Sequence, residues 1–269
     1  MIIMQEPEKR EQNRRSSKGN QLKFEREGIW YKADYTGYEG LAEYVVSHLL
    51  SCSTLNENEF VLYEPEEIAY RETVFNGCKS RDFTGGWQLI TLERLFMQRY
   101  GKGLNSILYS IPDHTQRLKT MAECVENLTG ISGFGIHLAK MLTVDTLFLN
   151  EDRHTHNIAV MTNDRQEYRL CPIFDNGASL LADTTIDYPL GADGLALMKK
   201  ARPKTFCEDF EEQADIAEQL YGETIHFRFG YREVKSIVDR AEMYGEEVRQ
   251  RVIDLVMSRR QTYRYLFRE

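Results

Sequence analysis

The sequence DTLFLNEDRHTHNIAVM, at residues 145–161, decides how this chain is interpreted. A short apolar run enters a wholly polar loop, and a second apolar run leaves it. After a turn predicted at 162–164, the chain reaches CPIFDNG at 171–177. This order predicts a polar loop, then a two-stranded ribbon, and then an acidic residue followed by glycine at the end of the ribbon.

Three polar side chains, Asp152, Asn157 and Asp175, are expected to converge on one side of that ribbon. Phosphoryl transfer needs a group that accepts the proton of the attacking hydroxyl, and it needs oxygen ligands for Mg²⁺ on the triphosphate. Asp152 is the candidate catalytic acid/base, and Asn157 and Asp175 are the candidate metal ligands. Gly177 is expected to let the backbone turn away after the metal ligand.

A cation for the phosphates is expected from Lys32, in the middle of an early strand. Glu39 and Glu43 lie four residues apart on one face of the following helical segment, and either is a candidate partner for this lysine. Each feature alone is ordinary, because Asp/Asn loops, Asp-Asn-Gly turns and strand lysines are common. Their order and spacing together match the requirements of a kinase site.

The chain is predicted to be α+β, with a strand-rich first lobe at 16–86 and a helical second lobe at 87–269, preceded by a flexible tail at 1–15. Apolar periodicity and turn residues predict the local elements. Strands are expected in a hairpin over 21–35 and at 60–63 and 73–75, and helices at 38–50, 89–100, 116–128 and 134–149, with a further helical apolar face over 232–255.

Composition narrows the class of protein. The 269 residues carry 34 Lys and Arg against 42 Asp and Glu, a formal net charge of −8, so nucleic acid is not the expected partner. No apolar run is long enough to span a membrane, and the first residues do not resemble a signal peptide. The five scattered cysteines suggest reduced thiols and a cytoplasmic location.

The DRHxxN pattern at 152–157, followed by PIFDNG at 172–177, resembles the catalytic loop and metal-binding turn of HipA-like serine/threonine kinases, in particular the short, CtkA-type members. The resemblance also includes Trp30-Tyr31-Lys32, the helix at 39–50 and the segment at 77–83, and spans roughly residues 16–185. It implies a two-lobed kinase fold that binds ATP and Mg²⁺ between the lobes and phosphorylates a protein.

The resemblance assigns Asp152 as the catalytic residue, Asn157 and Asp175 as metal ligands, and Lys32 as a phosphate contact. It also places adenine against the backbone somewhere in 84–90 and the phosphate loop around Ser17 and Gly19, with Ser16 or Ser17 as a candidate autophosphorylation site. That loop has a single glycine, and Asn176 stands where eukaryotic kinases have Phe. An antitoxin partner is an expectation from family analogy alone, and the protein substrate is unknown.

Three other functions remain open on sequence grounds. The same loop resembles that of phosphatidylinositol kinases, so a lipid or small-molecule kinase is the first alternative. The acidic stretches at 176–194 and 205–224 contain no Lys or Arg and suit a neutral or basic protein segment better than a lipid head group. A nucleotide-binding pseudokinase is a second alternative, although Lys32, Asp152, Asn157 and Asp175 are all present. A metal-dependent hydrolase using His154 and His156 is a third, with an incomplete set of ligands.

Overall fold

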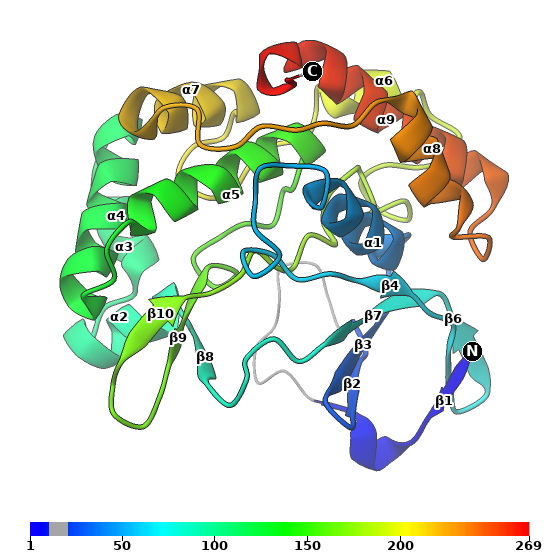
Figure 1. Cartoon of the computed structure of the whole chain (residues 1–269), viewed down its shortest axis with the longest axis horizontal. Coiled ribbons are helices and arrows are strands. Elements are labelled where there is room, and N and C mark those ends of the chain that lie inside the picture. Colours follow the sequence, from blue (N-terminus) through cyan, green and yellow to red (C-terminus); the bar gives the residue numbers. More distant parts are fainter. Residues whose placement is uncertain (11–20, 269) are drawn as a thin grey trace. The chain divides into compact units, whose positions relative to one another are not determined.

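The computed structural model describes residues 1–10 and 21–268, and its mixture of short strands and helices confirms the predicted α+β class. The chain divides into two units (Figure 1). Unit 1 consists of Met1–Phe83, Phe174–Ala201 and His226–Glu269, and unit 2 consists of Thr84–Ile173 and Arg202–Ile225.

Unit 1 combines two small sheets with four α-helices among its described residues. Its strands are β1 (Ile2–Met4), β2 (Lys23–Arg26), β3 (Ile29–Ala33), β4 (Glu64–Pro65), β5 (Ile68–Tyr70), β6 (Thr73–Phe75) and β7 (Gly77–Arg81). Its helices are α1 (Glu39–Leu50), α6 (Gly194–Met198), α8 (Tyr231–Asp239) and α9 (Glu246–Thr262), with 3-10 turns at Glu6–Glu8 and Arg264–Leu266.

The larger sheet of unit 1 has the order β2-β3-β7-β4 and is antiparallel throughout. Its β2–β3 hairpin turns at Glu27 and Gly28, both with positive φ (53° and 75°), as a two-residue hairpin turn requires. This turn fixes the register, in which Lys23 pairs with Lys32 and Lys32 pairs with Cys78 of β7.

The two faces of this sheet have different roles. Phe24, Tyr31 and Ala33 are buried with Ile68 and Tyr70 of the second sheet, whose order is β1-β5-β6, and form one hydrophobic core. Because side chains alternate along a strand, the residues between them face the opposite side. That opposite side carries the lysines of β2 and β3.

Helix α1 packs closely on the start of β7. A Cβ atom at Gly40 would lie 2.5 Å from the backbone carbon of Gly77, so only glycine permits this approach. The helix is buried around most of its circumference, which includes Glu43. A charged residue in such a helix needs a specific partner.

Unit 2 is built on two long helices and a small sheet. Its helices are α2 (Leu92–Tyr100), α3 (Leu104–Leu108), α4 (His114–Thr129), α5 (Phe134–Phe148) and α7 (Phe210–Tyr221), and its sheet has the order β10 (Tyr168–Leu170), β9 (Ala159–Thr162), β8 (Gln88–Thr91). The α5 helix is buried around most of its circumference and packs on α4 and α7. The polar loop 150–157 follows its C-terminus directly.

Several local predictions differ from the structure. Residues 1–15 were expected to be a flexible tail, but Ile2–Met4 form a strand that pairs with β5, and residues 11–15 lie outside the described part. The prediction of a strand at 60–63 is wrong, because only Phe60 has a bridge assignment, residues 61–63 have no strand assignment, and β4 begins at Glu64. The segment 89–100 begins as β8 and becomes α2 only at Leu92, where the Thr91 hydroxyl accepts the N–H of Arg94.

The apolar face expected over 232–255 belongs to two helices, α8 and α9, separated by the turn at 240–245. Both helices lie in unit 1, although the sequence placed this region in the second lobe. Helix α8 packs on α1, as Figure 1 shows, while α9 packs on α8 and α6. Among the described residues, no helix is both long and apolar enough to cross a membrane.

Candidate active site

Lys32 lies at the centre of a cluster of polar groups within unit 1. Its Nζ atom is 2.5 Å from Glu43 Oε1 and 2.7 Å from Asp175 Oδ1. Nζ also lies 3.5 Å from the Tyr63 hydroxyl and 5.1 Å from the centre of that ring. The structure thus brings together Lys32, Glu43 and Asp175, which the sequence proposed separately.

The charge state of Lys32 follows from these neighbours. Burial alone would lower its pKa, but the negative charges of Asp175 and Glu43 outweigh burial and raise the pKa well above the usual value. The ammonium group therefore stays charged at any physiological pH. A permanent, oriented positive charge is what a phosphate-binding lysine requires.

The two carboxylates differ in their access to solvent. The Glu43 side chain is 1% exposed, whereas the Asp175 side chain is 26% exposed. Glu43 Oε2 also accepts the backbone N–H of Asn176 at 2.8 Å. Glu43 is therefore a buried holder of Lys32, and Asp175 is the carboxylate that can reach a hard cation.

The backbone turns at Asp175, not at the glycine that follows it. Asp175 has φ of 62°, while Gly177 does not adopt a left-handed conformation. A Cβ atom at Gly177 would lie 3.4 Å from the Cβ of Glu39, so this glycine lies against α1. The expected role of Gly177 as the turning residue is thus corrected to one of close packing.

Glu39, the alternative partner for Lys32, binds elsewhere. Its carboxylate accepts the N–H groups of Tyr35, Thr36 and Gly37 and the hydroxyl of Thr36, at 2.7–3.2 Å. It therefore closes the loop that leads into α1, and Glu43 is the residue beside Lys32.

Lys23 is a second lysine at this site that the sequence analysis missed. It lies opposite Lys32 in the β2–β3 register and on the same face of the sheet. Burial lowers its pKa, while the negative charge of Asp175 acts in the opposite direction. The two-residue turn at Glu27-Gly28 was the available signal, because counting outward from it pairs residue 23 with residue 32.

In unit 2, the polar loop brings Asp152 and Asn157 together. The Asn157 side-chain amide donates to the Asp152 backbone oxygen at 2.8 Å and to Asp152 Oδ2 at 3.2 Å. Because the amide nitrogen is used in this way, the amide oxygen of Asn157 is the atom suited to a cation. The convergence of these two residues with Asp175, which belongs to unit 1, stays a prediction.

A buried ion pair braces this loop. Arg153, 1% exposed, binds Asp145 of α5 with Nε to Oδ2 at 2.9 Å. The guanidinium also donates to the Asn157 backbone oxygen at 3.3 Å, and the Thr205 hydroxyl donates to the Arg153 backbone oxygen at 2.6 Å. Arg153 therefore fixes the path of the loop from its interior, while the Asp152 side chain is 12% exposed.

The two histidines of the loop are neighbours of Asp152. His154 Nε2 lies 3.6 Å from Asp152 Oδ1, and His154 Nδ1 accepts the backbone N–H of His156 at 3.2 Å. Within residues 1–10 and 21–268, no group of three or more His, Cys, Asp or Glu side chains is arranged to hold a metal ion. Mg²⁺ on a nucleotide does not need such a cage, since phosphates and water fill most of its positions.

Other predicted contacts have different outcomes. Ser17 and Gly19, the candidate phosphate loop, lie outside the described residues, as does Ser16. In the candidate adenine segment 84–90, the Thr84 backbone oxygen accepts the N–H of Trp87 at 3.0 Å, and Arg169 lies over the Trp87 ring. Contact with adenine stays a prediction.

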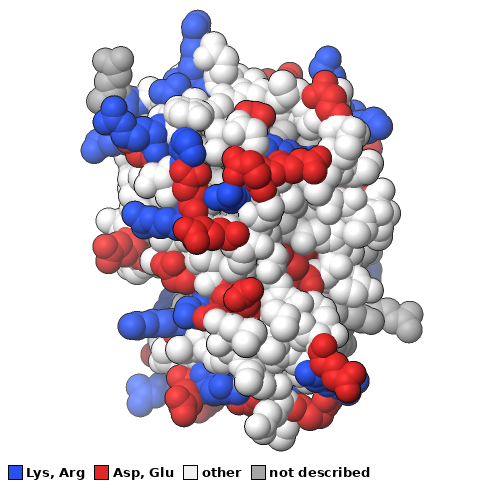
Figure 2. Space-filling view, turned by 90° about the vertical axis from the view of Figure 1, so that its right-hand side faces the viewer, with Lys and Arg blue, Asp and Glu red and all other residues white. Residues whose placement is uncertain are grey.

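Acidic residues that suggested a basic protein substrate have structural partners. Asp183 accepts the backbone N–H of Ile186, Asp193 caps α6, and Asp209 caps α7. Glu212 binds His114 at 2.7 Å. On the face shown in Figure 2, acidic and basic side chains are intermingled. The acidic stretches therefore give little information about the substrate.

No protein-family model matches the sequence, and no curated protein matches it. Among solved structures, the Helicobacter pylori proinflammatory kinase CtkA is similar, with a TM-score of 0.63 over 98% of this chain and 96% of that chain, at 17% sequence identity. The chain has a kinase-like fold. At this identity the similarity concerns the fold, and the chemistry has to be argued from the residues described above.

Proposed function

We propose that this chain is an ATP- and Mg²⁺-dependent serine/threonine protein kinase of the HipA-like type, which transfers the γ-phosphoryl group to a protein hydroxyl. The observation that carries the proposal is the buried charge cluster of unit 1. A permanently charged Lys32 is held by the inaccessible Glu43 and lies beside the accessible Asp175. The kinase-like fold supports it.

In this proposal the residues of unit 1 bind and orient the nucleotide. Lys32 contacts phosphate oxygens, and Lys23 adds a second positive charge on the same face of the sheet. Glu43 keeps the ammonium group in place. Asp175 and Asn157 would hold Mg²⁺, which supplies charge neutralisation at the phosphates when bound.

In this proposal the polar loop of unit 2 binds and deprotonates the acceptor hydroxyl. Asp152 orients this hydroxyl and accepts its proton as the new bond to phosphorus forms. Asn157 holds Asp152 through its side-chain amide, and Arg153 holds the backbone of Asn157. Autophosphorylation of Ser16 or Ser17 is part of the proposal because the resemblance to HipA-like kinases implies it.

The test is incubation of the purified protein with labelled ATP and Mg²⁺, with label located by intact mass and peptide mapping. Wild type is compared with Asp152→Asn and with Asp164→Asn, an exposed aspartate in the β9–β10 turn. We expect label on serine or threonine in wild type and Asp164→Asn, and its loss in Asp152→Asn. A general protein substrate such as casein is included, because the physiological acceptor is unknown.

Other outcomes distinguish the alternatives. Transfer only to phosphatidylinositol vesicles would replace the protein kinase by a lipid kinase. Mg²⁺-dependent nucleotide binding without transfer to any acceptor would favour a pseudokinase. The absence of nucleotide binding would contradict the proposal entirely.

A further inference from the structure

Helix α1, which carries Glu43, is covered by the C-terminal part of unit 1. The Tyr44 hydroxyl of α1 donates to the backbone oxygen of Ile237 in α8 at 3.1 Å. The side chains of Val234, Ile237 and Val238 form the buried face of α8. The position of α1 therefore depends on a segment almost two hundred residues further along the chain.

The turn at 240–245, between α8 and α9, makes two polar contacts to the region around α1. Asn76, just before β7, donates its side-chain amide to the Met243 backbone oxygen at 3.1 Å. Tyr244, 4% exposed, donates its hydroxyl to Asp34 Oδ2 at 2.8 Å. A buried tyrosine hydroxyl with a carboxylate acceptor is a specific, charge-assisted contact.

Asp34 transmits this contact to the Lys32 site. Its other oxygen, Oδ1, accepts the backbone N–H of Gly40 in the first turn of α1 at 2.5 Å. Asp34 also lies two residues after Lys32, immediately beyond β3. One carboxylate thus joins the lysine strand, the start of the glutamate helix and the α8–α9 turn.

We propose that Tyr244 is a positioning residue that acts through Asp34 to hold α1, and with it Glu43, against Lys32. The proposal deepens the proposed kinase function and rests on it for its kinetic consequences. Tyr244 itself need not touch substrate or nucleotide. Its contribution is to keep the Lys32–Glu43 pair assembled.

The ionisation of Asp34 offers a specific signature of this contact. Burial raises the pKa of Asp34 to about 7, the charge of Glu39 adds to the rise, and the hydrogen bonds from Gly40 and Tyr244 oppose it. The negative charge of Asp34 also contributes to raising the pKa of the Cys78 thiol in β7. The ionised carboxylate is the stronger acceptor, so the contacts of Asp34 with Gly40 and Tyr244 are strongest above this pKa, even though ionising a buried carboxyl lowers the stability of the fold as a whole.

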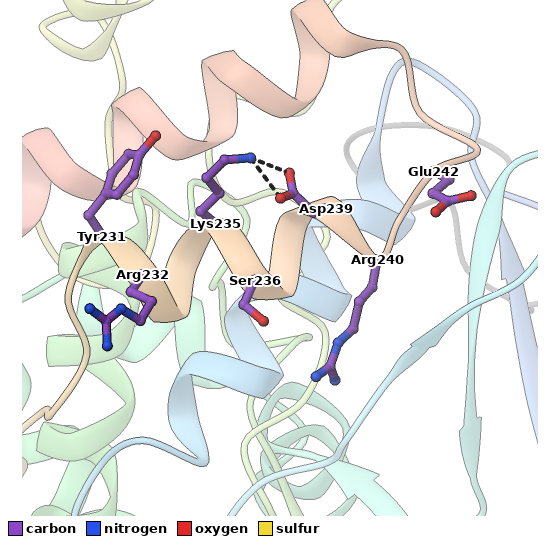
Figure 3. A pocket seen from close by; sticks show the side chains of 7 residues that line it. All are labelled: Tyr231, Arg232, Lys235, Ser236, Asp239, Arg240 and Glu242. Atoms are coloured by element: carbon purple, nitrogen blue, oxygen red, sulfur yellow. Dashed lines mark hydrogen bonds and ion pairs between the residues drawn. The ribbon is translucent and has the colours of Figure 1, made fainter.

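A matched control lies on α8 itself. Tyr231 is 52% exposed and lies on the same side of the helix as Lys235 and Asp239 (Figure 3). Its replacement by phenylalanine removes the same hydroxyl from the same C-terminal segment without affecting Asp34. Tyr231→Phe therefore controls for any general effect of the substitution.

The first measurement is hydrogen–deuterium exchange of the backbone amides at 34–46 in the full chain, without nucleotide. In Tyr244→Phe we expect exchange in the first turns of α1 to be faster on the order of tenfold, the size typical of a lost hydrogen bond to a charged group. Tyr231→Phe should exchange as wild type does. Equal exchange in wild type and Tyr244→Phe would overturn the proposal.

The second measurement is the pH profile of phosphoryl transfer between pH 5.5 and 8.5. Wild type should lose kcat, with little change in KM for ATP, as pH falls through about 7. In Tyr244→Phe this fall in kcat should occur at higher pH, because a hydrogen bond that lowers the pKa of Asp34 is lost. In Asp34→Asn the fall in kcat should be absent. The same pH dependence of kcat in all variants would contradict the proposal.

The two measurements separate this inference from the proposed function. If wild type transfers no phosphate but Tyr244→Phe alone loosens α1, the kinase proposal fails and the positioning contact is supported. If wild type transfers phosphate while Tyr244→Phe changes neither exchange nor kcat, the kinase proposal is supported and the positioning role is refuted.

Discussion

Asn176 donates its backbone N–H to Glu43 Oε2 at 2.8 Å, so the residue that follows Asp175 is tied to the helix that holds Lys32. Glu43 therefore has two partners for its two oxygens, the lysine ammonium group and a backbone amide. A fully buried carboxylate is tolerated only when both oxygens are paired. This contact makes the geometry of Lys32 and the backbone at Asp175 depend on each other.

Replacing Lys32 should destabilise the fold as well as abolish transfer. Lys32→Met leaves Glu43 buried without its cation, and we expect a loss of about 3–5 kcal/mol in the free energy of unfolding. The double variant Lys32→Met/Glu43→Gln should lose less, because the uncompensated charge is removed. Urea unfolding measures both. Lys79→Met, which removes a more exposed lysine paired with Glu66, should cost about 1 kcal/mol or less.

Removing the charge of Asp175 should weaken binding of the metal–nucleotide complex more than it weakens the fold. Asp175→Asn keeps the shape of the side chain, and Lys32 retains Glu43. We expect the Kd for Mg-ATP, measured by calorimetry, to rise about tenfold or more, because a hard cation prefers a charged oxygen ligand. Unchanged affinity in Asp175→Asn would refute its role as a metal ligand. Asp239→Asn, on the exposed face of α8, is the control.

The stability of the protein should depend on pH through Asp34. Its pKa rises from 3.8 to about 7 in the folded chain, mainly through burial. The folded state therefore binds this proton more tightly than the unfolded state, and the associated stability is present below about pH 4 and is lost as pH rises to about 7. Relative to wild type, Asp34→Asn should gain a few kcal/mol across this range. Denaturation at pH 4.5, 6 and 8 tests the sign.

A methyl group at position 40 should displace α1. In Gly40→Ala the new Cβ would meet the backbone of Gly77 at 2.5 Å, and neither rigid element can yield cheaply. We expect a loss of about 1–3 kcal/mol in stability together with reduced transfer. In Gly191→Ala the added atom meets nothing within 4 Å, so this variant should resemble wild type. Equal stability of the two variants would show that α1 can shift without cost.

Local patterns predicted the parts of the site that neighbouring residues determine. The β2–β3 hairpin and α1 formed where alternation and helical spacing indicated them, and the polar loop after α5 brought Asp152 and Asn157 together. The strand predicted at 60–63 failed for a physical reason. Val61 and Tyr63 are buried beside Cys78, and the Tyr63 N–H donates to the Ser47 hydroxyl instead of to a neighbouring strand.

Contacts between distant segments were beyond these patterns. The periodicity of α8 and α9 reveals that each has an apolar face, but it does not say which surface that face covers. Which of Glu39 and Glu43 pairs with Lys32 also depended on the loop before α1, whose backbone N–H groups donate to the Glu39 carboxylate. The place of Lys23 opposite Lys32 could have been predicted, because the hairpin register follows from the length of its turn.

Unit 1 is assembled from three separate stretches of the chain, with all of Thr84–Ile173 inserted between the first and the second. During synthesis, α1 emerges long before α8 and the turn that bears Tyr244, so the face of α1 that α8 covers has no partner until residues 231–239 have been made. Contacts of such large sequence separation form slowly, because a long loop has to close first. We therefore expect the Lys32 region to be among the last to acquire native structure, and a nascent chain stalled before residue 226 to be a ready client for chaperones.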